Sequence, residues 1–521
     1  MTFDAHQLDT FLLVGSVVTI LAILAVRLSS RAGLPSLLIY LLMGVGLGES
    51  GLGVRFGDAE LAHALGFGAL IIILAEGGLT TNWREIRPVM RMGLSLATIG
   101  VAVSVTVMAL AAHFVLGLPW ELAVLLGAVT SSTDAAAVFS VLRVVPLPRR
   151  LTGALEAESG LNDAPTVVLV TLVSSGAAAE HGVLYMAGII AFELLAGLVI
   201  GLAVGFGGAW VMRRAALPSS GLYPLAVLVL TFLAYAVGAA VHASGFAAVY
   251  VAALVLGNSD LPHRTATRSF SEGVAWLAQI GLFVMLGLLL FPSRITLHSV
   301  GLAVAAGLVL TLVARPLSVL ASSIVRPMSW QDTAFMSWAG LRGAVPIVLT
   351  TIPLAAGVNG SEQLFDIVFV MVVIFTIVTG PTLPWAAKVL DVVQRSEPRD
   401  LEMEAAPLER VAADLLQITI SPQSLMHGVE VGELRLPRGA SVSMVIRDNE
   451  TLVPERRTVL RRGDDLLVVT PRKVRDATEQ RLRQVSIGGR LAQWLGPDQL
   501  SEKRDKRGEK RGAEHRTDWG D

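Results

Sequence analysis

Long apolar runs separated by short polar loops fill roughly the first 390 residues, and the rest of the chain lacks them. An α-helix needs about 20 consecutive apolar residues to cross a bilayer. This measure predicts thirteen spans with loose boundaries, of which the ninth is short. The spans lie at about 10–28, 34–49, 61–79, 93–116, 120–141, 151–175, 184–212, 222–241, 245–258, 271–291, 298–317, 333–356 and 363–388. The pattern therefore predicts an all-α polytopic membrane domain over residues 1–390.

The loops between these spans differ in their arginine content. One alternate set of loops contains only Arg55 and Arg294, whereas the other set contains Arg27, Arg31, Arg84, Arg87, Arg91, Arg143, Arg149, Arg150, Arg213, Arg214, Arg264, Arg268 and Arg326. Positively charged loops mark the cytoplasmic side of a membrane. We therefore expect the N-terminus outside and, after an odd number of spans, the C-terminus in the cytoplasm.

The sequence after the spans has the pattern of a linker and a small soluble domain. Residues 391–414 are polar and are predicted to form a helical linker. Over residues 415–480, short or alternating apolar runs are separated by the turn sequences RDNE and RRGDD, which is typical of β-strands. Residues 481–521 mix charges of both signs with few apolar residues, so we expect a polar, largely disordered tail.

The composition agrees with a membrane domain joined to a soluble appendage. Hydrophobic residues make up 53% of the 521 residues and charged residues 16%, with a mean hydropathy of +0.64. A soluble domain has about 25% charged residues. The absence of cysteine excludes disulfides and cysteine-based metal sites. The net charge of -1 gives no reason to expect a nucleic-acid partner.

The fifth span is interrupted by the polar sequence TSSTD at 130–134. Ser, Thr and Asp side chains compete for backbone hydrogen bonds and can unwind a helix locally. Helices broken at the middle of a bilayer expose carbonyl groups and helix ends, from which transporters build ion sites. A polar stripe that packs against another helix is the alternative. The carboxylate of Asp134 in mid-span favours an ion site.

The sixth span begins with a cluster of polar residues, EAESGLND at 156–163. Ser159 and Asp163 are four residues apart and share one helix face, and Glu158 and Asn162 share a neighbouring face. A monovalent cation prefers oxygen ligands with one balancing charge, which Asp163 with Ser159 would supply. Glu158 points away from this pair and needs a different partner.

The twelfth span contains one arginine, Arg342, about ten residues from its start. A guanidinium cannot lose its proton there and must be paired, and Glu158 is the obvious candidate. Such a buried pair is more plausible as a structural clamp than as a source of net stability. Spans five and twelve are seven apart and cross in opposite directions, as inverted repeats do.

Three further acids lie within the predicted spans. Glu76, near the cytoplasmic end of span three, is either a second cation ligand or an end residue that reaches the membrane surface. Glu156 is close enough to the cytoplasmic face to be solvated. Glu193 has no motif around it, and a structural role is the simpler interpretation.

The segments TSSTDAAAVFSVLR and ALEAESGLNDAP together strongly resemble the monovalent cation:proton antiporters of the CPA-1 family. The resemblance covers the whole membrane part. It implies the sodium/proton antiporter fold, with inverted repeats and broken crossing helices, and no enzymatic activity. VGELRLPRGA and LRRGDDLLVV resemble the RCK C-terminal (TrkA-C) domain attached to potassium transport proteins, which is a small α/β domain and points to the potassium/proton branch.

The resemblance also implies roles for individual residues. Asn162 and Asp163 would be the ion-binding signature, with Ser159, Thr133, Asp134 and Glu76 contributing, and Glu158 would pair with Arg342. The transported cation would lie at Asp163, Ser159, Thr133 and Glu76. The family implies a homodimer in the cell inner membrane, alternating access, no cofactor, and one-for-one electroneutral exchange where the signature is Asn-Asp. Ala135 replaces the usual proline after Thr133-Asp134, and this departure leaves the expected activity in place but puts the cation choice in question.

The hypothesis for the mechanism is that Asp163 holds either one proton or one cation, so that competition couples opposite fluxes. A sodium/proton or unselective exchanger is an alternative, because both cations use the same oxygen ligands. A ligand-gated cation channel is disfavoured by the lack of a carbonyl-ring filter sequence. In the soluble domain a small anionic or nucleotide ligand could bind Arg438, Arg447, Arg456, Arg457, Arg461 and Arg462, although a solvated basic face is the simpler interpretation.

Overall fold

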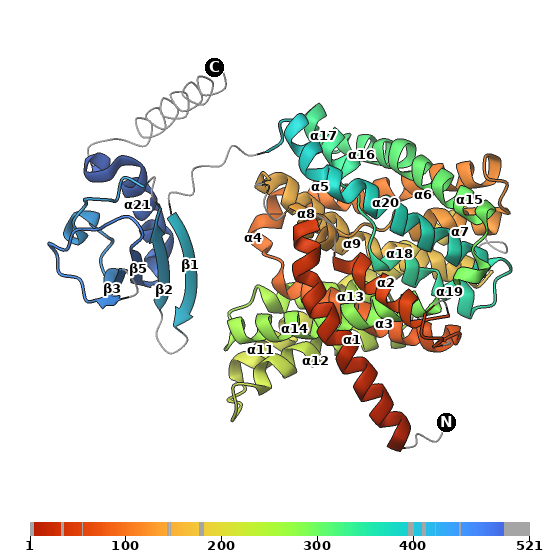
Figure 1. Cartoon of the computed structure of the whole chain (residues 1–521), viewed down its shortest axis with the longest axis horizontal. Helices are drawn as coiled ribbons and strands as arrows, with labels where there is room; N and C mark the ends of the chain where they lie inside the picture. Colours follow the sequence, from red (N-terminus) through yellow and green to blue (C-terminus); the bar gives the residue numbers. More distant parts are fainter. Residues whose placement is uncertain are drawn as a thin grey trace. The chain divides into compact units, whose positions relative to one another are not determined.

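A computed structural model describes residues 5–493 apart from 33–35, 50, 55, 143–144, 146, 177–181, 394–400, 409–412, 422–423 and 448–449. The chain forms two compact units, Met1–Gln394 and Arg395–Asp521. The first unit is helical, and the second contains a β-sheet (Figure 1).

Each predicted span falls on a helix or a series of helices within the described residues. In the first half of the first unit these are α1 (Ala5–Ala32), α2 (Ser36–Leu47), α3 (Ala59–Thr80), α4 (Trp83–Ile86), α5 (Met90–Ser95), α6 (Val101–Phe114), α7 (Trp120–Ser131), α8 (Ala135–Leu142) and α9 (Arg149–Ser174). In the second half they are α11 (Val183–Arg214), α12 (Leu222–Ala240), α13 (Gly245–Gly257), α14 (Arg264–Leu289), α15 (Leu297–Val309), α16 (Arg315–Ser323), α17 (Trp330–Trp338), α18 (Ala344–Leu349), α19 (Thr351–Ala355) and α20 (Ser361–Val389). Within the described residues, seven helices are long and apolar enough to cross a membrane, and shorter apolar helices account for other spans.

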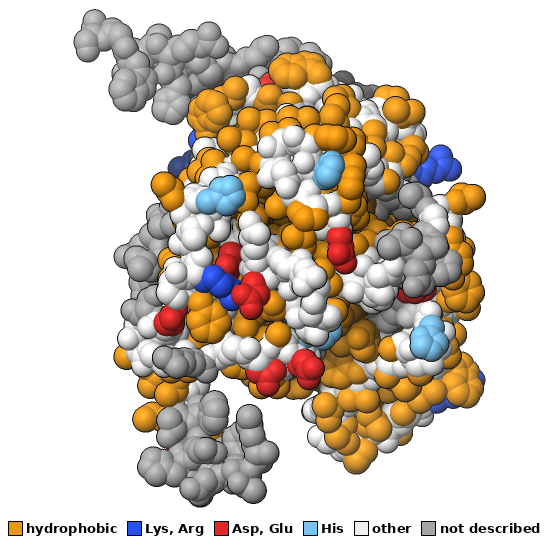
Figure 2. Space-filling view, turned by 90° about the vertical axis from the view of Figure 1, so that its right-hand side faces the viewer, with side chains coloured by type: hydrophobic (Ala, Val, Ile, Leu, Met, Phe, Trp, Pro, Cys, Tyr) orange, Lys and Arg blue, Asp and Glu red, His pale blue; other side chains and the backbone are white. Residues whose placement is uncertain are grey.

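The surface of the first unit is apolar where a membrane would contact it. On α11 the side chains of Phe192, Leu195, Val199 and Phe206 are all more than half exposed. Figure 2 shows hydrophobic side chains gathered in the upper and lower-right parts of one face, with acidic, basic and histidine side chains toward its middle. An apolar surface of this extent is expensive in water and is expected against lipid.

The helices of the first unit divide into two bundles. In bundle A, α1–α3 and α11–α14 pack on one another, chiefly α11 on α13, α2 on α14, and α3 on both α13 and α14. In bundle B, α5–α9 and α15–α20 pack on one another, chiefly α6 on α7, α9 on α5 and α7, and α15 on α20. The bundles meet where α9 contacts α11 and α13 and where α19 contacts α3.

Two spans of bundle B are broken in the middle, as predicted. The chain is unwound over 132–134 between α7 and α8, and over 339–343 between α17 and α18. The two unwound segments meet, because the backbone N–H of Asp134 donates a hydrogen bond to the carbonyl of Leu341 at 2.9 Å. Backbone groups that lack a helical partner thus satisfy each other across the break.

Spans four and eleven each contain one π-helical turn, at Leu96–Gly100 and at Leu310–Ala314. The first packs on α16 and the second on α6. The two spans also exchange hydrogen bonds, from Ser95 Oγ to the carbonyl of Ser322 at 3.1 Å and from Ser322 Oγ to the carbonyl of Ser95 at 3.2 Å. Spans four and eleven are seven apart, like spans five and twelve, so matching irregularities recur in two halves of one bundle.

In the described part of the second unit, helix α21 (Arg475–Gly488) covers an antiparallel sheet. Its strands are β1 (Leu401–Leu408), β2 (Ala413–Ile420), β3 (Ser441–Arg447), β4 (Glu450–Leu452) and β5 (Asp465–Pro471), in the order β1-β2-β5-β3-β4. Helix α21 (Arg475–Gly488) buries Leu482 and Val485 against the apolar face of the sheet, which includes Leu416, Leu466 and Val468. Alternate residues of β5 are buried, as its sequence pattern predicts.

The soluble domain of the structure differs from the predicted one at both of its ends. Strand β1 lies inside the predicted helical linker, so the prediction of a helix at 401–408 is wrong. Helix α21 continues past residue 480 into the predicted tail, because Leu482 and Val485 complete the core. The rest of the predicted tail, 494–521, lies outside the described residues.

Candidate functional site

The carboxylate of Asp163 is buried in the middle of α9, opposite the break between α7 and α8. The hydroxyl of Ser132 donates a hydrogen bond to Asp163 Oδ1 at 2.5 Å. Ser132 is itself buried and belongs to the unwound segment, where helical spacing does not apply. Spacing along α9 singles out Ser159 instead, so Ser132 is a site residue that the sequence pattern missed.

The adjacent residues join the same two segments. Asn162 Nδ2 donates a hydrogen bond to Thr133 Oγ1 at 2.8 Å, and both side chains are buried. The other amide atom, Asn162 Oδ1, is buried and has no hydrogen-bond partner in the described part of the chain. A buried oxygen without a donor needs an explanation, and an unseen ion or water is one of the common ones.

Asp134 has a different environment. Its Oδ1 accepts a hydrogen bond from the backbone N–H of Ala137 at 3.1 Å, which caps the start of α8. Its carboxylate also occupies the space where a Cβ at Gly343 would stand, at the start of α18. A negative charge is favourable at helix N-termini. Asp134 therefore faces the positive ends of two half-helices.

The buried partner of Glu158 is Arg315 on α16, so the predicted pairing with Arg342 is wrong. Arg315 Nη2 donates to Glu158 Oε2 at 2.9 Å, and Arg315 Nη1 donates to Glu158 Oε1. Arg315 Nη2 also donates to the carbonyl of Met336 at 3.2 Å. Both charged side chains are almost fully buried. Arg315 is placed for this because α16 begins at Arg315, directly after the π-helical turn.

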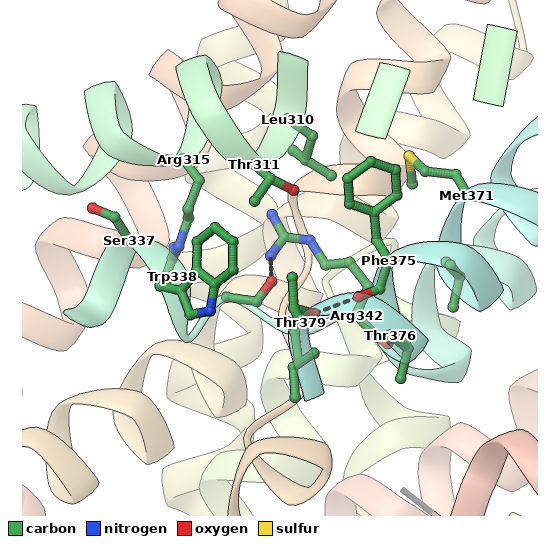
Figure 3. Close-up of a pocket in the computed structure, with 13 residues that line it drawn as sticks. Leu310, Thr311, Arg315, Ser337, Trp338, Arg342, Met371, Phe375, Thr376 and Thr379 are labelled. Atoms are coloured by element: carbon green, nitrogen blue, oxygen red, sulfur yellow. Dashed lines mark hydrogen bonds between the residues drawn. The ribbon is translucent and has the colours of Figure 1, made fainter. Parts of the chain in front are cut away.

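Arg342 is satisfied by carbonyl groups rather than by a carboxylate. Its Nε donates to the carbonyl of Thr130 at 2.9 Å, and its Nη1 donates to the carbonyl of Gly340. In Figure 3 the guanidinium of Arg342 extends toward Thr311, and Arg315 lies on the other side of the same pocket. Thr130 lies in the last turn of α7, so Arg342 places a positive charge at the negative end of a half-helix.

The remaining predicted ligands are not all brought to Asp163. Ser159 is half-buried, one turn before Asp163 on α9. Glu76 is half-buried on α3 in bundle A, and no hydrogen bond between its carboxylate and Asp163 is present in the described residues. Glu156 and Glu193 are also half-buried. The structure thus groups Thr133, Asn162 and Asp163 within one bundle and leaves Glu76 in the other.

Tyr250 is a second residue that sequence reasoning missed. It lies on α13 of bundle A, where its side chain is buried. Its ring and hydroxyl fill the space where a Cβ at Gly160 would stand, beside Ser159 and one turn from Asp163. A tyrosine in a small apolar helix is a weak signal in a sequence, because aromatic residues are common in membrane helices.

Two features of the crossing have an opposite charge beside them. Glu158 is matched by Arg315, and the end of α7 by Arg342. In the described residues no arginine or lysine lies within 4 Å of Asp163, whose hydrogen-bond partner is the Ser132 hydroxyl. No group of three His, Asp or Glu side chains that could hold a metal ion occurs in the described part of the chain. Asp163 is thus suited to one proton or one monovalent cation.

Comparison with known families agrees with this arrangement. A family model described as "Sodium/hydrogen exchanger, transmembrane" matches residues 17–389, and a second, described as "TrkA-C domain", matches residues 415–483. The family models therefore cover both units of the chain.

Several curated proteins are similar over most of their length. The K(+)/H(+) antiporter NhaP of Alkalimonas amylolytica is 38% identical over 474 residues, which cover 88% of this chain and 81% of that protein. The K(+)/H(+) antiporter NhaP2 of Shewanella oneidensis is 33% identical over 500 residues, covering 95% and 87%. The Na(+)/H(+) antiporter ApNhaP of Aphanothece halophytica is 26% identical over 451 residues, covering 82% and 84%.

The fold is similar to that of a solved structure. The sodium proton antiporter MjNhaP1 from Methanocaldococcus jannaschii superposes with a TM-score of 0.63 at 21% identity, covering 74% of this chain and 99% of that one. At this identity the likeness concerns the fold alone.

Proposed function

The chain belongs to the sodium/hydrogen exchanger family, and we propose that it exchanges potassium ions for protons across the cell inner membrane by competition at Asp163. The observation that carries this proposal is a buried carboxylate without a compensating cation. Ionised Asp163 in a low-dielectric site would be costly, so it is neutralised by whichever positive ion is available. A proton and a cation cannot both occupy it, and this exclusion couples their opposite movements.

Oxygen atoms around Asp163 would complete the cation site. The unpartnered Asn162 Oδ1 and the hydroxyls of Ser132 and Thr133 lie on the two segments that meet at Asp163. Such neutral oxygens are suitable ligands for a hard monovalent cation. With one carboxylate in the signature, the loaded site is neutral with either ion, which favours electroneutral exchange. Glu76 would join from bundle A when the bundles shift during alternating access.

Potassium is proposed as the cation because the relatives that are 38% and 33% identical carry the name K(+)/H(+) antiporter. Sodium is the second candidate, since the relative that is 26% identical is called a Na(+)/H(+) antiporter. The arrangement of oxygens accommodates either ion, so the choice between them requires a transport measurement.

We also propose that the protein is a homodimer, with the N-terminus outside and the C-terminus in the cytoplasm. The uneven distribution of loop arginines supports the orientation.

We propose that the TrkA-C domain regulates transport by binding a small anionic ligand. Arg447 is already bound to Asp464, at 2.8 and 2.7 Å, so the exposed arginines at 438, 456, 457, 461 and 462 are the candidates.

Proteoliposomes that enclose a pH-sensitive dye test the function directly. A potassium gradient is expected to drive proton movement in the opposite direction, and a sodium gradient to drive it less. Asp163→Asn should abolish the exchange, whereas Asp332→Asn, at the distant pair with Arg150, should retain most of it. Exchange that survives Asp163→Asn would overturn the mechanism, and equal or faster exchange with sodium would overturn the cation assignment.

A further inference from the structure

One face of α14 carries a basic pair at the predicted cytoplasmic end of the helix. Arg264, Arg268 and Ser271 are spaced four and three residues apart, so they share that face. Both arginines are half-buried, and Ser271 is only 1% exposed. We propose that this face binds a phosphate-bearing anion.

Three polar atoms of this face lack hydrogen-bond partners in the described residues. The Nε atoms of Arg264 and Arg268 and the Oγ of Ser271 are buried without a hydrogen bond in the described residues. Neither arginine takes part in a salt bridge in the described part of the chain. Buried donors are normally satisfied, so three on one face indicate a ligand that accepts hydrogen bonds.

The electrostatics of the site favour an anion. The positive end of the α14 dipole lies where Arg264 begins the helix, and the charged groups near Arg264 include Arg268, Arg84 and Asp260. The exposed Glu272 lies one turn after Arg268 and forms no salt bridge with it in the described residues. The three arginines outnumber the two acids, Asp260 and Glu272, so this region is positive. A cation at a helix N-terminus is unfavourable unless an anion compensates it. The site therefore favours a further negative charge from a ligand.

Other arginines at the same membrane face do not share this arrangement. Arg213 and Arg214 are exposed, and the guanidinium of Arg214 lies 4.2 Å from the ring centre of Trp210. Arg326 donates to the carbonyl of Pro88. These side chains are solvated or satisfied by the protein, which makes Arg213 and Arg214 a matched control pair.

A phosphate group fits these donors. A guanidinium presents paired N–H groups to phosphate oxygens, and a helix N-terminus favours negative charge. The phosphate could belong to an anionic phospholipid or be free in the cytoplasm. On another face of α14 Phe270 and Leu277 are 40% and 61% exposed, so lipid chains can lie beside the helix. The headgroup of an anionic phospholipid is therefore the expected source.

The test measures thermal unfolding of the full-length protein in detergent with three additives. These are phosphatidylglycerol, phosphatidylcholine and inorganic phosphate. We expect phosphatidylglycerol to raise the midpoint temperature in a saturable manner and phosphatidylcholine to leave it nearly unchanged. In Arg264→Gln/Arg268→Gln the rise should be lost, and in Arg213→Gln/Arg214→Gln it should remain.

The outcomes separate the possible sources. A rise with inorganic phosphate that the same double variant loses would support the site and assign it to a soluble ligand. If the double variant does not fold, Arg264→Lys/Arg268→Lys keeps the charge but loses the paired donors, and we expect its affinity for phosphatidylglycerol to be about tenfold weaker. No rise with either anion, an equal loss in the control pair, or undiminished affinity in the lysine variant would overturn the proposal.

Discussion

Glu158 and Asp163 lie five residues apart on α9, and their surroundings differ in one respect. The carboxylate of Glu158 meets the guanidinium of Arg315, whereas that of Asp163 meets only the hydroxyl of Ser132 in the described residues. Five residues turn a helix by about 140°, so the two side chains point at different neighbours. We expect the acid with a counter-charge to hold helices together and the acid without one to exchange its ion.

The larger effect is expected on stability, at the pair of Glu158 and Arg315. Replacing Arg315 by Gln leaves Glu158 as an unpaired buried charge, so we expect the membrane unit to lose about 3–5 kcal/mol of stability. The midpoint of thermal unfolding in detergent measures this change. The double variant Glu158→Gln/Arg315→Gln should recover much of the loss, because no buried charge remains.

Arg150 provides the control for this prediction. Its side chain is 64% exposed, and it contacts Asp332 at 3.1 Å. Only Asp332 of this pair is buried, and solvent screens the exposed guanidinium, so Arg150→Gln should lower the midpoint less than Arg315→Gln. If Arg315→Gln were as mild as Arg150→Gln, the contrast between the two acids of α9 would lose its basis.

At Asp163 we expect an effect on transport rather than on stability. Ser132→Ala removes the hydroxyl that contacts Asp163, and a hydrogen bond to a charged group is worth about 1.5–3 kcal/mol. We expect the KM for the transported cation in proteoliposomes to rise about tenfold or more, because 1.4 kcal/mol corresponds to a factor of about ten. The melting midpoint should change less than in Arg315→Gln.

The neighbouring serine is the matched control for Ser132. The hydroxyl of Ser131 donates to the carbonyl of Ala128 at 2.7 Å, within its own helix. Ser131→Ala should therefore leave the KM near that of the unchanged protein. Equal KM values for the two alanine variants would contradict the assignment of Ser132 to the ion site.

A third acid, exposed in the soluble unit, gives the smallest effect. The backbone N–H of Glu430 donates to Glu433 Oε2 at 2.9 Å, and this bond, with nearby Arg490, lowers the pKa of Glu433. Because the folded pKa is depressed, the stabilisation is present above the ordinary carboxyl value and is lost as the pH falls through the folded pKa.

Thermal unfolding of the full-length protein between about pH 3 and 7 checks this prediction. Glu433→Gln should remove a small part of the acid destabilisation of the soluble unit. Glu455→Gln serves as the matched control, since Glu455 is also exposed and forms no salt bridge in the described residues. A profile unaffected by Glu433→Gln would show that the exposed acid contributes nothing.

The sequence was sufficient for the features that depend on local pattern. Apolar length predicted the spans, and the TSSTD interruption predicted the break at Asp134. The contact between Asn162 and Thr133 joins two residues that the family resemblance had named. These features arise from local composition or from motifs, which a single chain displays directly.

The sequence was insufficient where the register of a helix changes. Arg315 lies near the predicted end of span eleven, but the helix continues to Ser323 after a π-helical turn. The extra residue of a π turn rotates the remainder of the helix, so Arg315 faces Glu158 instead of the membrane surface. Ser132 was missed for a related reason, because an unwound segment has no helical period from which to infer its neighbours.

Hydrogen bonds join the two breaks in bundle B to each other. The N–H of Asp134 reaches the carbonyl of Leu341, and the guanidinium of Arg342 reaches the carbonyl of Thr130. Bending at either break would pull both bonds apart inside the membrane, where water cannot replace them. We therefore expect the two breaks to move together as one rigid unit and not to act as hinges. The transport movement would then be a sliding of one bundle along the other at their boundary, where Tyr250 contacts Gly160.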